Sequence, residues 1–314
     1  MQKTIIVGSR NSQLALTQTN YIIELLQKHF PATVFSVKPI KTEGDKILDV
    51  PLAKIGGKGL FVKEIEQALL SKEIDFAVHS MKDVPTVIVE GLTLAAMTER
   101  AEPRDCYIAK DGRTGLFESP QGAIIGTSSL RRSAQLLHLR PDLQIVPIRG
   151  NVNTRFRKLA ETELDGIMLA YAGVYRLGWA ERVTEIIDME KSLPAVGQGA
   201  LGIEVREDDK EILAMMATIN DPNTYTAVTA ERAFLRQLEG GCQVPIGAFC
   251  QLIGDELVLK GMVASLDGKT VLRDQIRGSF REASMLGNKL AEMLLERGAA
   301  ELLLQARQEY DAHD

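Results

Sequence analysis

The chain contains 314 residues, enough for two or three domains of ordinary size. Hydrophobic residues make up 45% of it and charged residues 25%, which excludes disordered, collagen-like and disulfide-scaffold proteins. The net charge of −5 at pH 7 argues against a general nucleic-acid binder.

The apolar stretches of the sequence predict neither a membrane-spanning helix nor a signal peptide. The longest apolar stretch, residues 166–174, is far shorter than the ~20 residues of a membrane-spanning helix, and residues 5–7 are too short for a signal-peptide core. Cys106, Cys242 and Cys250 form an odd set without a C-x-x-C pair, which favours neither disulfides nor a zinc site. We therefore expect a cytoplasmic protein that binds no membrane and no metal.

Short β-branched runs alternate with helical patterns near the N-terminus. We expect strands at residues 4–8, 33–40 and 75–79 and helices at residues 12–30 and 60–70. This order predicts a mostly parallel sheet with helices on its faces.

The same rhythm restarts after a polar stretch at residues 98–104. The expected strands and helices are residues 105–109, 123–126, 143–148 and 166–170, and residues 129–139 and 152–162. Two α/β units in tandem predict a two-lobed protein with a ligand cleft between the lobes.

The last third of the chain has a different pattern. A helix at residues 224–238 precedes three strands and a long helical tail from Arg281 onward, which predicts a small α+β domain. The three strands are expected at residues 247–253, 256–264 and 270–278. Asp221-Pro222 marks the expected boundary, because proline disfavours helix in the residue before it.

Positive charge is concentrated in residues 126–176. Eight basic and four acidic side chains give this segment a net charge of +4. Seven of the eight cations are arginine, whose planar fork suits carboxylates and phosphates, so we interpret the segment as the wall of an anion site. The cations are Arg131, Arg132, Arg140, Arg149, Arg155, Arg157, Lys158 and Arg176.

Two loops place hydroxyl groups beside arginine at the start of a helix. They are residues 8–12 and residues 126–132. Either loop alone reads as an ordinary serine N-cap with a surface arginine. Two such loops, one in each lobe and each after a strand, favour an anion-binding site at the helix N-termini.

Two glycine-rich motifs resemble nucleotide-binding motifs but lack a feature that those motifs require. Residues 54–59 resemble a phosphate loop, but Gly59 follows Lys58 where serine or threonine is required, so a mobile basic flap is the better interpretation. Residues 197–202 match G-x-G-x-x-G but precede a strand at residues 203–206, whereas a dinucleotide-binding motif must open a helix.

Residues 79–85 follow a strand that has the composition of a buried one. Ser80, Lys82 and Asp83 therefore lie at the carboxyl end of a strand, where open α/β sheets bind ligands. Asp83 could act as a general acid or base or as a counter-ion to a cation, and the alternative is a surface ion pair with Lys82. His79 by itself is typical of a structural histidine.

Cys242 follows two glycines that end a helix. A cysteine in a tight turn is a candidate nucleophile or attachment point, although most free cysteines are buried and inert. We give Cys106 and Cys250 that inert interpretation.

Six motifs in this order resemble the porphobilinogen deaminase family, also called hydroxymethylbilane synthases. They are residues 9–15, residues 79–85, residues 126–132, Arg149-Gly150-Asn151 with Thr154-Arg155, residues 193–200 and residues 240–245. The resemblance covers nearly the whole chain.

The resemblance implies two periplasmic-binding-protein-like lobes and a small C-terminal α+β domain. Lobe 1 would contain residues 1–99 with 200–217, lobe 2 residues 105–193, and the last domain residues 222–314. It also implies an enzyme, a transferase that joins four porphobilinogen molecules head to tail with loss of ammonia to give hydroxymethylbilane. The alternative is a non-catalytic two-lobed anion-binding or sensor protein.

The resemblance further implies site residues and a monomer. The chain would grow on a dipyrromethane cofactor attached covalently through Cys242, and Asp83 would be catalytic. The cofactor would be held by Lys82, Thr127, Ser128, Ser129, Arg131, Arg132 and Asn151. The substrate and the growing chain would be bound by Arg10, Ser12, Arg149, Arg155 and Arg176, with Lys54 and Lys58 as flap contacts.

Overall fold

The computed structural model describes residues 4–46, 62–239 and 244–312. These residues form two compact units. Unit 1 contains residues 4–46, 62–101 and 199–225, and unit 2 contains residues 102–198, 226–239 and 244–312. The chain therefore leaves unit 1 after Ala101 and re-enters it at Gly199.

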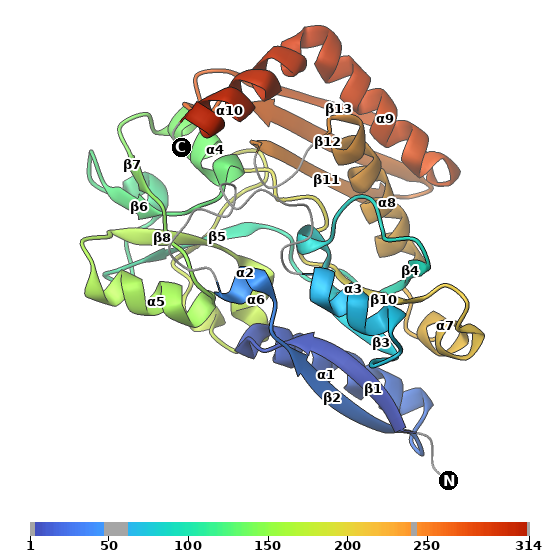
Figure 1. Ribbon diagram of the computed structural model, residues 1–314. Coiled ribbons are helices and arrows are strands. Elements are labelled where there is room, and N and C mark those ends of the chain that lie inside the picture. The colour runs from blue at the N-terminus through green and yellow to red at the C-terminus, as the bar shows by residue number, and fades with distance from the viewer. Residues whose placement is uncertain (1–3, 47–61, 240–243, 313–314) are drawn as a thin grey trace. The chain divides into compact units, whose positions relative to one another are not determined.

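Unit 1 is built on a five-stranded sheet with the strand order β2-β1-β3-β10-β4 (Figure 1). Its strands are β1 (Thr4–Arg10), β2 (Val34–Ile40), β3 (Phe76–Ser80), β4 (Leu92–Met97) and β10 (Leu201–Arg206). Its helices are α1 (Gln13–His29), α2 (Glu43–Lys46), α3 (Lys63–Leu70) and α7 (Lys210–Ala217), with a 3-10 turn at Met81–Asp83.

Helices cover both faces of this sheet because the strand side chains alternate. Phe76 and Val78 of β3 pack in one cluster with Ile22 of α1 and Met216 of α7. Ala77, between them in sequence, packs on the opposite face in the cluster of α3. The carboxyl end of β3 is thereby fixed from both sides.

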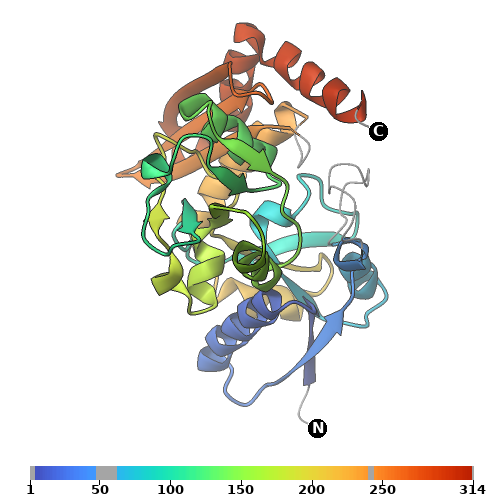
Figure 2. The same cartoon turned by 90° about the vertical axis from the view of Figure 1, so that its left-hand side faces the viewer.

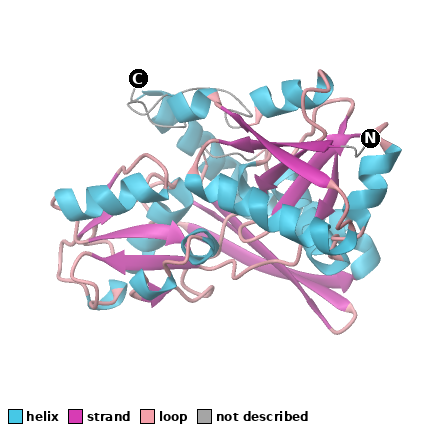
Figure 3. Ribbon diagram, turned by 90° about the horizontal axis from the view of Figure 1, so that it is seen from below, coloured by secondary structure: helices cyan, strands magenta, loops and turns pink. Residues whose placement is uncertain are grey.

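The first part of unit 2 repeats this topology with the order β7-β6-β8-β5-β9. Its strands are β5 (Asp105–Ala109), β6 (Ile124–Gly126), β7 (Gln144–Val146), β8 (Gly166–Ala170) and β9 (Glu185–Ile186). Its helices are α4 (Leu130–Leu139), α5 (Val152–Glu161) and α6 (Tyr171–Arg176), with 3-10 turns at Leu116–Glu118 and Ala180–Arg182. Helices again flank the strands (Figure 3).

The prediction of a mostly parallel sheet is confirmed, since four of the five strands in each sheet run in one direction, but each sheet also contains one antiparallel strand. In unit 1, β1 is parallel to β2 and β3, but β10 is antiparallel to β3 and β4. In unit 2, β5 is likewise antiparallel to β8 and β9. A helical crossover within one sheet produces parallel neighbours, whereas β10 and β5 enter their sheets from the other unit and are free of that constraint.

The rest of unit 2 is an antiparallel sheet with the order β11-β12-β13, covered on one face by helices (Figure 2). The elements are α8 (Pro222–Gln237), which begins in unit 1, β11 (Ile246–Ile253), β12 (Glu256–Ala264), β13 (Val271–Ser279), α9 (Ala283–Leu294) and α10 (Ala300–Ala312). The predicted single helical tail is divided at Gly298, whose φ of 98° interrupts the helix.

The predicted fold class is confirmed, since two α/β lobes are followed by a small α+β domain. Strands β4 and β9 and helices α2, α6 and α7 were not predicted from the sequence. Within the described part of the chain, no helix is long and apolar enough to cross a membrane.

Gly202 of β10 packs closely against the turn that follows β3. Gly202 pairs with His79, and a Cβ atom at residue 202 would lie 2.1 Å from Sδ of Met81, which is 1% exposed. Gly202→Ala should therefore lower the free energy of unfolding by about 1–3 kcal/mol, measured by urea denaturation. If this contact is the cause, Gly202→Ala with Met81→Ala will cost less than the sum of the single changes; additive costs would contradict it.

Candidate functional site

The turn Met81–Asp83 presents the predicted catalytic residue at the end of β3. Lys82 Nζ lies 2.7 Å from Asp83 Oδ1, and the two side chains are 36% and 29% exposed. The surface ion pair considered as the alternative is thus present in the structure. Both side chains nevertheless remain accessible from solvent at the end of a buried strand.

Charge keeps Asp83 ionised. Burial by itself would raise the pKa of the Asp83 carboxyl, but the charges of Lys82 and Arg10 outweigh burial and hold that pKa below its usual range. Arg10, at the end of β1, therefore acts electrostatically on Asp83 as well as being a predicted substrate residue.

His79 has a structural environment. Its Nε2 lies 2.9 Å from Oε2 of Glu204 on β10, and both side chains are almost fully buried. Glu66 of α3 is also buried, and burial together with the charge of Glu204 raises the pKa of Glu66. The interpretation of His79 as a satisfied buried histidine agrees with these contacts.

Both predicted serine caps are confirmed. Ser12 caps α1 by accepting a hydrogen bond from Ala15 N at 3.2 Å. Ser129 caps α4 by accepting one from Arg132 N at 3.4 Å. Of the neighbouring hydroxyls, Ser128 Oγ donates to the Ile148 carbonyl at 2.8 Å.

Arg131 and Arg132 converge on one buried carboxylate, Asp105. Arg131 NH1 donates to Asp105 Oδ2 at 2.6 Å, and Arg132 NH2 donates to Asp105 Oδ1 at 2.8 Å. Asp105 is fully buried, and the arginines are 5% and 7% exposed. Two guanidinium groups share one carboxylate, so this cluster carries a net charge of +1.

Two further side chains complete the environment of Asp105. Ser192 Oγ donates to Oδ2 at 3.3 Å, and Gln198 Nε2 donates to Oδ1 at 2.9 Å. Burial would raise the pKa of Asp105, but the charges of Arg131 and Arg132 hold it well below its usual range. The two arginines therefore favour the ionised form of Asp105 at neutral pH.

The remaining arginines of residues 126–176 do not share one environment. Arg140 pairs with Asp142 at 2.7 Å, and Arg157 lies 3.8 Å from Glu161 on the surface of α5. Arg155 Nε donates to the Gly150 carbonyl at 3.0 Å. Only part of the segment therefore resembles a continuous anion-binding wall.

Three further predicted residues have defined positions in unit 2. Asn151 caps α5 by accepting a hydrogen bond from Thr154 N at 2.9 Å. Arg149 lies just before that cap, and Arg176 ends α6; both are partly buried.

Three predicted residues, Lys54, Lys58 and Cys242, lie outside the described part of the chain. Cys106 and Cys250 are buried, as expected, and burial raises the pKa of the Cys106 thiol to about 12. The glycine motif at residues 197–202 leads into strand β10, which agrees with the rejection of dinucleotide binding.

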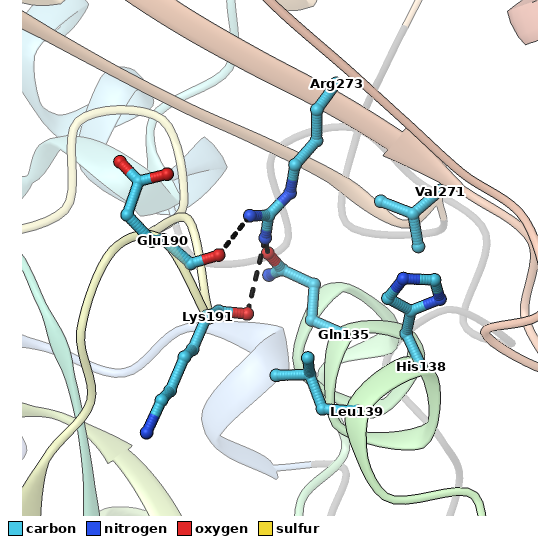
Figure 4. Close-up of a pocket in the computed structure, with 7 residues that line it drawn as sticks. All are labelled: Gln135, His138, Leu139, Glu190, Lys191, Val271 and Arg273. Carbon is cyan, nitrogen blue, oxygen red and sulfur yellow. Dashed lines mark hydrogen bonds between the residues drawn. The ribbon is translucent and has the colours of Figure 1, made fainter.

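A cavity of about 180 Å³ in unit 2 contains none of the predicted site residues. It lies beside α4, the 190–191 segment and β13 (Figure 4). The lining residues are Gln135, His138, Leu139, Glu190, Lys191, Val271 and Arg273. Among the residues that the structure describes, no group of three or more acidic, histidine or cysteine side chains could hold a metal ion.

Sequence reasoning missed Asp105, Ser192 and Gln198. The charge count over residues 126–176 excluded Asp105, which lies 26 residues before Arg131 in the chain. Aspartate at the first position of an otherwise apolar strand, residues 105–109, was the available signal, because a buried carboxylate needs a cationic partner.

Comparison with known proteins is consistent along the whole chain. Residues 5–214 match the family model described as porphobilinogen deaminase, dipyromethane cofactor binding domain, and residues 225–296 match porphobilinogen deaminase, C-terminal domain. The chain is 55% identical over 309 residues to the porphobilinogen deaminase of Carboxydothermus hydrogenoformans, covering 98% of this chain and 99% of that protein. It is 52% identical over 313 residues to that of Bacillus subtilis, covering 99% of both chains.

Likeness to solved structures is much weaker. The periplasmic VFT2 domain of Bordetella pertussis BvgS aligns with 69% of this chain and 86% of its own, with 14% identity and a TM-score of 0.41. The family matches and the identities above are decisive: the chain belongs to the porphobilinogen deaminase family, transferases of porphyrin biosynthesis that work with a dipyrromethane cofactor.

Proposed function

We propose that Asp83 is the catalytic residue of this enzyme. The observation that carries the proposal is the partly exposed Asp83 carboxylate at the carboxyl end of β3, held ionised by Lys82 and Arg10. When porphobilinogen loses ammonia, its C–N bond breaks and positive charge is left on the pyrrole. A pyrrole α-carbon then attacks this cation and loses its proton. A fixed carboxylate opposes the charge in both steps and can accept that proton.

Lys82 would have a second partner in the working enzyme. It is proposed to bind a carboxylate of the cofactor, and the ion pair in the structure shows that its ammonium can reach Asp83. Exchange of partners by Lys82 would leave Asp83 available to the pyrrole nitrogens. While Lys82 is engaged elsewhere, the charge of Arg10 would still act to lower the pKa of Asp83, against the effect of burial.

The residues of unit 2 fit a dipyrromethane group, whose acetate and propionate side chains are anionic. The buried Asp105 cluster carries one positive charge in excess, and a ligand carboxylate would neutralise it. Thr127, Ser128, Ser129 and the N-cap Asn151 add hydroxyl and amide groups at two helix N-termini. When bound, the group supplies the primer on which the tetrapyrrole grows.

The remaining predicted residues would bind the substrate and the growing chain. These are Arg10, Ser12, Arg149, Arg155, Arg176, Lys54 and Lys58. Arg155 and Asn151 both belong to the start of α5, so cofactor-binding and substrate-binding groups would be adjacent there.

We also propose three domains with the boundaries expected from the sequence, residues 1–99 with 200–217, 105–193 and 222–314. The pairing of β10 with β3 and β4 supports the return of the chain to the first lobe. A cytoplasmic monomer is proposed from the family resemblance. Sedimentation of the purified enzyme and fractionation of cells would test these two statements.

Replacing Asp83 tests the catalytic assignment. Asp83→Asn should lower kcat by ~10²-fold or more because the charge opposing the cation is lost, whereas Asp83→Glu should retain more activity. Steady-state rates with porphobilinogen measure the loss, and intact mass should show that cofactor and bound intermediates persist. Glu73→Gln, which breaks an exposed pair with Lys38 in the same unit, serves as the control. An Asn variant as active as the wild type would mean that Asp83 is structural.

The arginines should divide by the stage at which they act. Arg131→Leu or Arg132→Leu should leave protein of apo mass, because one positive charge of the Asp105 cluster disappears. Arg149→Leu or Arg155→Leu should keep the cofactor and stall elongation, visible as intermediates of fixed mass. Arg157→Leu removes an arginine that is 66% exposed and should change neither result. Normal holo protein and normal elongation from all of these variants would refute the anion-site assignment.

The attachment point is tested by mass. The purified protein should be heavier than its sequence by one dipyrromethane unit, mapped to Cys242 and absent from the buried Cys106 and Cys250. Cys242→Ser should give apo protein with a lower Tm, since the cofactor carboxylates would no longer neutralise the arginines. An adduct on another cysteine, or an unchanged melting curve, would contradict this prediction.

A further inference from the structure

Gln135, on α4, is a buried side chain of unit 2 that hydrogen-bonds to several segments of the chain. It has no role in the catalytic assignment above. Its side chain is 1% exposed. Oε1 accepts hydrogen bonds from Leu193 N at 2.8 Å and from Arg273 NH2 at 2.7 Å. Because both partners are N–H donors, they define which end of the amide is the oxygen.

The amide nitrogen of Gln135 binds the same segment from the other side. Nε2 donates to the Leu193 carbonyl at 3.1 Å, to Ser192 Oγ at 3.3 Å and to the Arg131 carbonyl at 3.2 Å. Both polar groups of the Leu193 backbone are therefore held by one side chain. A rotation of Gln135 would break all of these contacts together.

The Leu193 carbonyl is connected to the Asp105 cluster through Arg131. It also accepts a hydrogen bond from Arg131 NH1 at 2.6 Å, the same nitrogen that donates to Asp105 Oδ2. Ser192 Oγ reaches that Oδ2 atom at 3.3 Å. The position of the 192–193 segment thus determines where the guanidinium of Arg131 can lie.

Arg273 connects this network to the C-terminal sheet. It projects from β13, and its NH1 donates to the Glu190 carbonyl while NH2 donates to the Lys191 carbonyl at 3.3 Å. Figure 4 shows the guanidinium reaching both backbone oxygens and lying at the end of the Gln135 side chain. One arginine therefore binds residues 190 and 191 and the amide that orients residue 193.

We propose that Gln135 and Arg273 are positioning residues that hold Arg131 for an anionic ligand, and that they couple the C-terminal domain to the cofactor-binding arginines. The inference rests on the proposed function, because it assigns Arg131 to a carboxylate of the cofactor. It assigns to Gln135 and Arg273 a role that is exerted through Arg131 and not through contact with substrate or cofactor. The C-terminal domain, which contains Cys242, would thereby influence the position of Arg131, the arginine proposed to bind the cofactor attached at Cys242.

Reconstitution of apo enzyme tests the inference. Full-length Arg273→Met and Gln135→Leu are prepared as apo protein and supplied with porphobilinogen, and the holo form is followed by intact mass. Arg273→Met should load its cofactor about tenfold more slowly than wild type, since a hydrogen bond from a charged donor is lost. Gln135→Leu should be at least as slow, because it leaves the Leu193 backbone groups unpaired. The double variant should be no slower than Gln135→Leu alone, since both act through one path.

Arg297→Met is the matched control. Arg297 also bonds within the C-terminal domain, to the Arg273 carbonyl at 3.0 Å and to Asp274 at 2.9 Å, and within the described part of the chain none of its hydrogen bonds reaches residues 190–193. It should load at the wild-type rate. Equal loading by Arg273→Met and Arg297→Met would overturn the proposal, even if Arg273→Met had a lower Tm.

A double-mutant cycle separates positioning from general destabilisation. The effects of Arg273→Met and Arg131→Lys on loading should be strongly non-additive, whereas those of Arg273→Met and Arg155→Lys should add. Arg273→Lys, which keeps the charge and one donor, should load at an intermediate rate. Should Gln135→Leu fail to fold, the isosteric Gln135→Glu replaces it and must also load slowly. Additivity with Arg131→Lys refutes the coupling.

Failure of the inference can be distinguished from failure of the proposed function. A wild-type protein that carries no adduct would refute the assignment of the cofactor site itself. A wild-type holo protein beside an Arg273→Met variant that loads normally would refute only the positioning role.

Discussion

The carboxylate of Asp105 organises the part of unit 2 that is proposed to bind the cofactor. It accepts six hydrogen bonds, four from Arg131 and Arg132 and one each from Ser192 and Gln198. Removing a carboxylate from water costs several kcal/mol, so each of these donors contributes to the stability of the buried cluster. Strand β5, helix α4 and residues 192–198 are therefore held in one arrangement by a single side chain.

Unit 1 also contains a buried carboxylate that binds its neighbours from a central strand. Strands β10 and β5 occupy equivalent positions in the two sheets, and each enters its sheet from the other unit. Each carries a buried carboxylate on the strand, Glu204 or Asp105, that binds a cationic or potentially cationic group of that lobe. The crossing of the chain thus brings an acidic residue into each lobe beside the loop proposed to bind ligand.

Solvent exposure distinguishes the two structural carboxylates from the carboxylate that is proposed to be catalytic. Glu204 is 1% exposed and Asp105 is fully buried, so neither can meet a substrate without rearrangement. Asp83 is 29% exposed and keeps its charge through Lys82 and Arg10. A carboxylate that is ionised and accessible can oppose a cation on a substrate, whereas the buried ones can only orient their neighbours.

The sequence by itself determined the local elements and the family. Periodicity located β1, α1, α4, α5 and the three C-terminal strands, because the spacing of apolar residues is a local property. The serine caps of α1 and α4 were also readable, since a cap and its helix are adjacent in the chain. The order of six motifs was enough to indicate the enzyme family, which the comparisons confirm.

Tertiary structure alone decided the partners of the charged groups. Arg131 meets Asp105 across 26 residues, His79 meets Glu204 across 125, and Arg273 meets Gln135 across 138. The direction of β10 could not be predicted from the local sequence pattern for the same reason. This strand is antiparallel to β3 because the chain returns to unit 1 from the other unit. Hydrophobic periodicity records which face of an element is buried, but it contains no information about which distant side chain will lie against that face.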